Sequence, residues 1–212
     1  MKYGVRHQES YSRGELLLRT LFGVFYIALP HVLVLIFLML ASAILNFITF
    51  WAILITGKFP QGIFDYQLKL HRWQLRLASR LQNLSDGYPS FGLNVNDDNI
   101  TIEMERPAKS NRLTVLLRLM FGVFYVYIPH MICLLFLGIG ASFVRLIAFW
   151  VVLITGKYPV GMHNYMVGVM RWQFRVNAYM TNMTDTYPPF SMSGNEAKFE
   201  GDTTSSNDLL DN

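Results

Sequence analysis

Two tracts of forty residues that are almost free of charge constrain this chain more than any other feature. They run from Leu16 to Ile55 and from Val115 to Ile154. A stretch of about 18 or more apolar residues is typical of a membrane-spanning segment. Only 15% of the residues are charged, whereas a soluble domain carries about 25% and needs them to stay in water. The tracts therefore predict an integral membrane protein.

The first tract and its flanks recur 99 residues later without a gap, from Arg13 to Phe91. The recurring pairs include Phe22–Tyr26 with Phe121–Tyr125, Pro30-His31 with Pro129-His130, Phe50-Trp51 with Phe149-Trp150, Ile55–Lys58 with Ile154–Lys157, Arg72–Gln74 with Arg171–Gln173, and Asp86 with Asp185. Repetition at a fixed spacing indicates a repeat architecture. We therefore expect two tandem copies of one membrane unit, related as a pseudo-symmetric pair.

The repeat divides the chain into five segments. These are an N-terminal arm (1–12), a first repeat (13–91), a linker (92–110), a second repeat (111–190) and an acidic tail (191–212). Within the linker, Leu93 to Met104 alternates around Asn96–Asn99, which predicts a small β-hairpin. The polar, Ser/Thr-rich composition of the tail predicts disorder.

The placement of Lys and Arg favours a helical hairpin in each tract. If each tract were one spanning helix, the cations would divide about evenly between the two sides, with no positive-inside bias. If each tract folds back, every cation except Arg145 lies on one face, the pattern of cytoplasmic loops. A straight helix of forty residues is also about 60 Å long, twice the roughly 30 Å of the hydrocarbon core.

The turn of each hairpin is expected at residues 41–46 and 138–145, where small residues gather and where Asn46 and Arg145 occupy the same place. An Arg at a hairpin tip can reach headgroups, whereas one at the bilayer centre costs at least about 2.5–3.5 kcal/mol. A competing break lies at Pro30 and Pro129, because proline kinks or ends a helix. It would give a re-entrant segment followed by a spanning helix, and this alternative stays open.

Each tract is followed by Thr-Gly-Lys-aromatic-Pro, in which Gly and Pro end the helix. Apolar residues spaced by three and four then predict an amphipathic helix with a cationic flank, from Ile63 to Leu84 and from Met162 to Met183. Such a helix lies in the headgroup plane or packs on its own membrane helices. The residues expected to contact lipid or the interface are Lys58, Lys69, Arg72, Trp73, Arg76, Arg80, Lys157, Arg171, Trp172 and Arg175.

Ionisable residues at membrane depth are rare and frequently functional, which singles out His31, His130 and Arg145. Two His fall short of a metal shell, and the simpler interpretation is a neutral imidazole bonded to a carbonyl freed by the adjacent proline. The chain carries no phosphate-binding glycine loop, nucleophile elbow or HExxH motif, and its single Cys133 excludes an internal disulfide. The sequence therefore predicts no catalytic residue, no metal site and no cofactor.

The second copy carries a set of motifs at Gly156–Pro159, Arg171-Trp172, Arg175 and Asp185–Phe190. With Pro-His and Phe-Trp upstream, these motifs resemble an uncharacterised bacterial membrane-protein family that is a domain of unknown function. The first copy departs from the pattern at Phe59, Arg80, Gly87 and Ser90. The resemblance covers both copies and implies a location in the bacterial inner membrane, but it implies no activity.

These features favour a structural or adaptor protein over an enzyme. We expect an all-α, multi-pass membrane protein with cytoplasmic termini, which acts as a platform for anionic lipids, a membrane-protein partner or further copies of itself. The net charge of +4 suits membrane topology and anionic lipids rather than nucleic acid. The alternative is a small transporter or channel with a site on the pseudo-two-fold axis, lined by His31, His130 and Arg145.

Overall fold

Two long helices dominate the computed structural model, which describes residues 1–199. The first consists of α1 (Arg13–Gly23), a π-helical turn η1 (Val24–Ala28) and α2 (Leu29–Thr56) without interruption. The second consists of α4 (Arg112–Gly122), η2 (Val123–Tyr127) and α5 (Ile128–Thr155). Each long helix has 44 residues and is apolar and long enough to cross a membrane.

The sequence explains where the long helices begin and end. The Ser12 hydroxyl and the Asn111 side chain accept backbone N–H groups of the first turns, as N-caps do. Gly57 and Gly156 follow the last turns in the left-handed region, with φ of 71° and 72°, where a side chain would be strained. The helix boundaries therefore agree with the Gly signal in the sequence.

The turns predicted at residues 41–46 and 138–145 are wrong, because these residues lie inside α2 and α5. Small residues in an apolar segment are compatible with a helix, and a helix satisfies every backbone N–H and C=O group internally. The competing break at Pro30 and Pro129 is wrong as well. Each proline lies in the first turn that follows a π-helical turn, where its missing N–H is tolerated and the helix continues.

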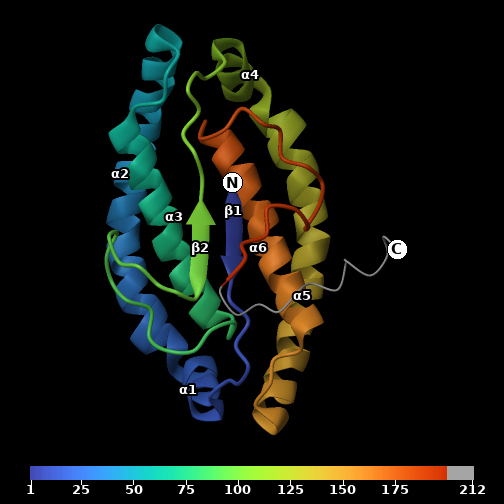
Figure 1. The fold of residues 1–212 in the computed structure, drawn as a ribbon. Coiled ribbons are helices and arrows are strands. Elements are labelled where there is room, and N and C mark those ends of the chain that lie inside the picture. The colour runs from blue at the N-terminus through green and yellow to red at the C-terminus, as the bar shows by residue number, and fades with distance from the viewer. Residues whose placement is uncertain (200–212) are drawn as a thin grey trace.

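Two shorter helices return along the long ones. They are α3 (Gln61–Leu81) and α6 (Val160–Met180), and each begins after a proline with extended backbone, Pro60 or Pro159. Each pair of helices is separated by only a few residues, so α3 runs back along α2 and α6 runs back along α5 (Figure 1). The two halves match in the order and length of their helical elements, which have 11, 5, 28 and 21 residues in each half.

A pair of antiparallel strands runs along the helices near the middle of their length (Figure 1). β1 (Lys2–Val5) pairs with β2 (Ile100–Glu103), with Tyr3 opposite Ile102. The β-hairpin predicted within the linker is therefore wrong, because the partner of β2 is the N-terminal arm. Alternating residues identify a strand but carry no information about a partner almost 100 residues away.

The segment after the second half continues beside these strands. Tyr3 N–H donates to the Asn195 carbonyl at 2.9 Å, and Tyr3 forms an isolated bridge with Glu196. The tail predicted to be disordered thus has its first residues, 191–199, in contact with the fold, while residues 200–212 lie outside the described part of the chain.

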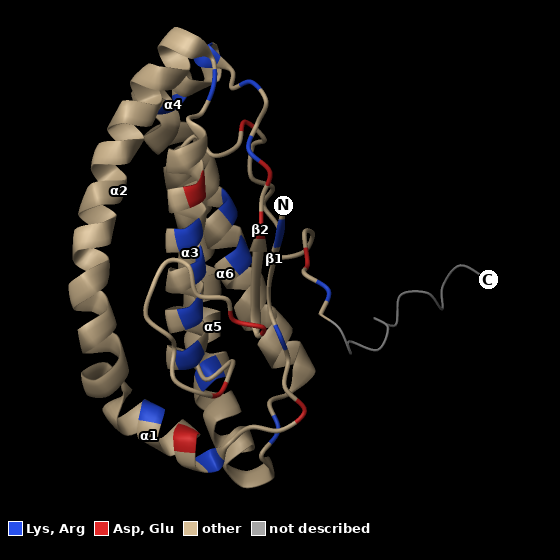
Figure 2. Ribbon diagram, turned by 60° about the vertical axis from the view of Figure 1, so that its left-hand side comes forward, with Lys and Arg blue, Asp and Glu red and all other residues tan. Residues whose placement is uncertain are grey.

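The elements form layers. The two long helices form one outer layer, α3 and α6 lie behind them, and the strand pair covers α3 and α6 from the other side (Figures 1 and 2). The main apolar core lies between these layers and includes Leu16, Ile53, Phe59, Val115 and Val152. A smaller cluster in each half surrounds Trp73 or Trp172.

Candidate membrane-facing surface

The outer face of the two long helices is an exposed apolar surface. Only 11% of the most apolar window of each helix is buried, which sets these helices apart from the core helices of soluble proteins. Phe37 of α2 is 72% exposed, and Phe136 at the same place in α5 is 68% exposed. Other large exposed side chains are Leu21, Phe25, Leu40, Phe47, Ile55, Met120, Phe124, Leu135, Phe143 and Ile154. So large an apolar surface marks a contact with lipid or with another protein.

Charge is almost absent from this surface. The sequence of α2 contains no Lys, Arg, Asp or Glu, and Arg145 is the one such residue of α5. In Figure 2, α2 has neither blue nor red residues, whereas α3, the strand layer and the helix ends carry many. Arg145 is exposed, and it makes no hydrogen bond or ion pair with any residue of the described chain. Its aliphatic stem lets the guanidinium reach toward a polar boundary.

The ends of the two long helices are joined crosswise. Arg13, at the start of α1, donates to the Ile154 carbonyl at the end of α5 at 2.8 Å. Arg112, at the start of α4, donates to the Ile55 carbonyl at the end of α2 at 2.8 Å. Each guanidinium therefore caps carbonyls that the last turn of a helix leaves free.

An exposed lysine lies beside each of these arginines. Lys157 follows α5 and Lys58 follows α2, and the backbone N–H of each donates to the threonine hydroxyl two residues before it. We call these two pairs, Arg13 with Lys157 and Arg112 with Lys58, the basic corners. They lie at the two ends of the apolar surface.

Most of the side chains predicted to contact lipid on α3 and α6 are instead inside the protein. Trp73, Arg76, Arg80, Arg171, Trp172 and Arg175 are all buried, and Lys69 and Arg72 are partly buried. Of the two alternatives for these helices, the buried positions fit packing on the protein itself and do not fit the lipid contact expected of these side chains. The helical periodicity was correctly identified, but it could not reveal that the strands and loops cover the cationic flank.

The buried arginines hold the strands and loops in place. Arg72 donates to the Ile102 carbonyl at 2.8 and 3.0 Å, and Arg171 donates to the Tyr3 carbonyl at 3.1 Å. One turn further along, Arg76 donates to the Val95 and Gly92 carbonyls. Arg175 bonds the Ser193 and Ser191 carbonyls in the same manner. Burial lowers the pKa of the Arg76, Arg171 and Arg175 guanidiniums.

Each of the two His of the long helices, His31 and His130, forms a pair with the Trp of its own half. Trp73 donates its indole N–H to Nδ1 of His31 at 2.9 Å, and the imidazole stacks on Phe91 with 3.8 Å between ring centroids. In the second half, Trp172 donates to His130 at 2.9 Å, and His130 stacks on Phe190 at 4.0 Å. Both His are fully buried. The structure therefore does not bring His31, His130 and Arg145 together on a common axis.

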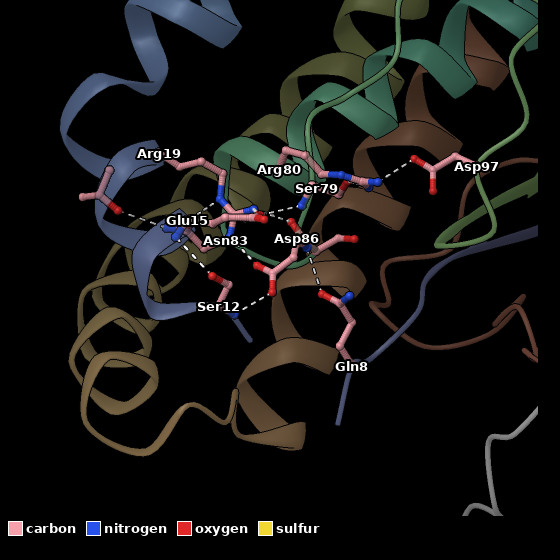
Figure 3. Close-up of polar contacts among 12 residues, drawn as sticks. Gln8, Ser12, Glu15, Arg19, Ser79, Arg80, Asn83, Asp86 and Asp97 are labelled. Carbon is pink, nitrogen blue, oxygen red and sulfur yellow. Dashed lines mark hydrogen bonds and ion pairs between the residues drawn. The ribbon is translucent and has the colours of Figure 1, made fainter. Parts of the chain in front are cut away.

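A further polar cluster escaped the sequence analysis. Arg19 of α1 bonds Asp86 at 2.7 Å, Asn83 at 3.1 Å and the Ser85 carbonyl at 3.0 Å, and it also contacts Glu15 (Figure 3). Asp86 in turn accepts the Ser12 N–H at 2.6 Å. The signal was available, because Arg19 and Arg118 are charges at the same place in both apolar tracts.

The same arrangement recurs in the second half. Arg118 donates to Asp185 at 2.6 Å and to Asn182 at 2.9 Å, and Asp185 accepts the Asn111 N–H at 2.7 Å. Asn83 and Asn182 have left-handed φ of 58° and 62°, which Asn tolerates better than most residues. In each half, a carboxylate after the return helix thus fixes the start of the long helix.

A cavity of about 220 Å³ lies between α3 and α6, next to the strands. Its lining includes Tyr3, His71, Gln74, Gln173 and Phe174. Burial lowers the pKa of His71. Within residues 1–199, no group of three His, Cys, Asp or Glu side chains is placed to hold a metal ion.

Part of the chain is similar to one protein family. Residues 112–192 match the model of a domain of unknown function, DUF4389. The match covers the second half, from the start of α4 through α6 to the segment that follows it, so it includes the buried Trp–His pair and the Arg118–Asp185 contact. Neither a curated protein nor a solved structure matches the chain.

Proposed function

We propose that this chain is a membrane-embedded structural protein that serves as a platform for lipids or for a partner complex. The observation that carries the proposal is the continuous exposed apolar surface of the two long helices. An apolar surface of this extent is unfavourable in water and requires lipid or protein against it.

The platform itself is the layer of α3, α6 and the strand pair. The guanidiniums of this layer donate hydrogen bonds to backbone carbonyls of the strands and loops. These arginines therefore stabilise the layer and do not form a reactive site. We further propose that the chain is a tandem duplication and that this layer, with the chain ends, faces the bacterial cytoplasm. The recurrence of its contacts at a spacing of 99 residues and the gathering of cations on that layer support these two points.

A transport pathway between the halves has less support. The cavity at the interface of the halves is lined by β1, β2, α6, α3 and the residue that follows α3, Gln82, and none of its lining residues comes from α2 or α5. His31 and His130 are each occupied by a Trp N–H and an aromatic ring within their own half. The geometry therefore favours the platform.

The test is purification in mild detergent from native membranes, followed by mass measurement and crosslinking. We expect a species heavier than one chain with its detergent, with crosslinks to a second copy or to a membrane partner, and with retained anionic lipid. A monomer that retains no lipid and crosslinks to nothing contradicts the proposal.

A further inference from the structure

The apolar and charged faces of this molecule are on opposite sides along its whole length. The long helices form one face, and the other carries the strand pair with exposed Lys2 and Glu103, which form an ion pair at 2.9 Å. The side chains of this pair are 60% and 57% exposed. The two faces divide the molecule parallel to the long helices rather than across them.

A crossing orientation would conflict with this division. Because the basic corners lie at the two ends of the molecule, long helices that cross the bilayer would place Arg13 with Lys157 on one side and Arg112 with Lys58 on the other. The strand pair runs along the helices near the middle of their length (Figure 1), so Lys2 and Glu103 would then lie near the bilayer centre. Charged side chains at that depth are costly and therefore rare.

An in-plane orientation removes the conflict. A helix with its side chains is about 10–12 Å across, close to the roughly 15 Å that one leaflet contributes to a hydrocarbon core of about 30 Å. The two long helices, which touch each other where α1 meets α5 and where α2 meets α4, thus each fill the apolar depth of a single leaflet. Both basic corners and the charged layer then lie at the same membrane surface, where the corners meet anionic lipid phosphates.

We propose that the chain is monotopic, with its two long helices lying in the plane of one leaflet and crossing the bilayer nowhere. The occupant of the apolar face is the acyl region of that leaflet, and phosphates of its anionic lipids bind the basic corners. This inference rests on the proposed function for membrane embedding, and it replaces the multi-pass topology expected from the sequence. The sidedness expected from the cations is retained without any hairpin turn.

The test is labelling of single cysteines with a membrane-impermeant maleimide in sealed inside-out and right-side-out vesicles. All variants carry Cys133→Ala. Gln61→Cys and Val160→Cys are exposed, occupy matching places in the two halves and lie beside opposite basic corners. Lys2→Cys reports on which side of the membrane the strand pair lies. Phe37→Cys, in the middle of the apolar face, is the control that lipid should protect, so it should react only after detergent is added.

We expect Lys2→Cys, Gln61→Cys and Val160→Cys to react fully in one vesicle orientation and not in the other. Any other pattern of these three, such as Gln61→Cys and Val160→Cys reacting from opposite sides, overturns the monotopic arrangement. Extraction of the same vesicles with alkaline carbonate separates the two proposals. If the protein stays in the membrane but Gln61→Cys and Val160→Cys react from opposite sides, only the monotopic topology is contradicted. If carbonate releases the protein, both membrane embedding and the monotopic topology are contradicted.

Discussion

The two ends of the molecule are built alike in backbone and differently in side chains. Beside α2, Phe59 packs edge to face on Phe64 with 5.5 Å between ring centroids. Beside α5, Tyr158 and His163 occupy the same places at 5.9 Å, and His7 lies 5.1 Å from His163. One end is therefore a plain apolar core, while the other contains an imidazole that is 1% exposed.

Other contacts are the same in both halves. The Trp–His hydrogen bond measures 2.9 Å in each, and the Arg–Asp contact at the start of the long helix measures 2.7 and 2.6 Å. The contacts that recur are those that fix the long helices to their return helices. The contacts that hold the long helices, and with them the apolar surface, are therefore the same in both halves. The side chains packed beneath the two ends of that surface differ.

The largest expected effect concerns the buried arginines. Arg118→Met leaves Asp185 without its cation, and losing one partner of a buried pair costs about 3–5 kcal/mol. Arg19→Met should cost a similar amount through Asp86, because Glu15, which also loses its cation, is 44% exposed and its ion pair adds little. Unfolding in mild detergent, followed by Trp fluorescence, measures both free energies.

The matched control for this prediction is the double variant Arg19→Met with Asp86→Leu, which removes both members of the Arg19–Asp86 pair and leaves only the 44% exposed Glu15 without its cation. It should recover part of the lost stability. If the double variant is as unstable as the sum of its single changes, the two residues do not act as a pair.

The second prediction uses the imidazole that distinguishes the two ends. Burial, and next the nearby His7, lower the pKa of His163 to about 4, below its unfolded value of about 6.5. The unfolded chain thus binds more protons, so this contribution to stability is complete above about pH 6.5 and is lost as the pH falls toward 4. The loss amounts to about 3 kcal/mol.

His163→Phe copies the opposite end and should remove this pH dependence, while Phe64→His should introduce it at the other end. Unfolding free energies measured from pH 7.5 to pH 4 give both slopes. An unchanged slope in His163→Phe would assign the acid sensitivity to another group.

The third prediction tests the Trp–His hydrogen bond, which has the same length in both halves. Trp73→Phe and Trp172→Phe each remove an indole N–H and leave Nδ1 of a buried His without its donor, which costs about 1–3 kcal/mol. Because the two geometries agree, we expect equal losses of unfolding free energy. A large difference between the two variants would show that the halves are not equivalent at this point.

The smallest effect is expected within the apolar face. Asn46 bonds Gln67 at 3.1 Å, whereas Arg145 at the same place in α5 is exposed. Asn46→Ala should cost about 1 kcal/mol for the lost hydrogen bond, and Arg145→Asn should change stability by no more than about 0.5 kcal/mol. The same unfolding measurement ranks the two variants, and the reverse order would mean that Arg145 has a structural partner.

The sequence predicted the helical part of this fold better than its topology. Hydropathy identified the two apolar helical tracts, although each was expected to break into a hairpin, and Gly57 and Gly156 indicated where the tracts end. Periodicity also found the amphipathic return helices. These are local signals, and a window of neighbouring residues contains them.

The features that failed depend on partners far along the chain. Nothing near Ile102 indicates that its strand pairs with Tyr3, and nothing near Arg76 indicates that a loop covers its guanidinium. The turns predicted at Asn46 and Arg145 came from an assumption about how the chain meets the bilayer, not from a turn motif. The sequence thus predicted the apolar composition of the candidate surface. It did not predict the strand pair and the arginine-bonded loops that pack beneath that surface.

The pairing of β1 with β2 also orders events during synthesis. Lys2 is synthesised before its strand partner Glu103, which follows only after about 100 further residues, on the order of 5–20 s at ordinary elongation rates. The end of α2 waits in the same way for Arg112 to reach the Ile55 carbonyl. The nascent first half must therefore persist with an unpaired strand and an uncapped helix, a period in which a chaperone or the insertion machinery can hold it.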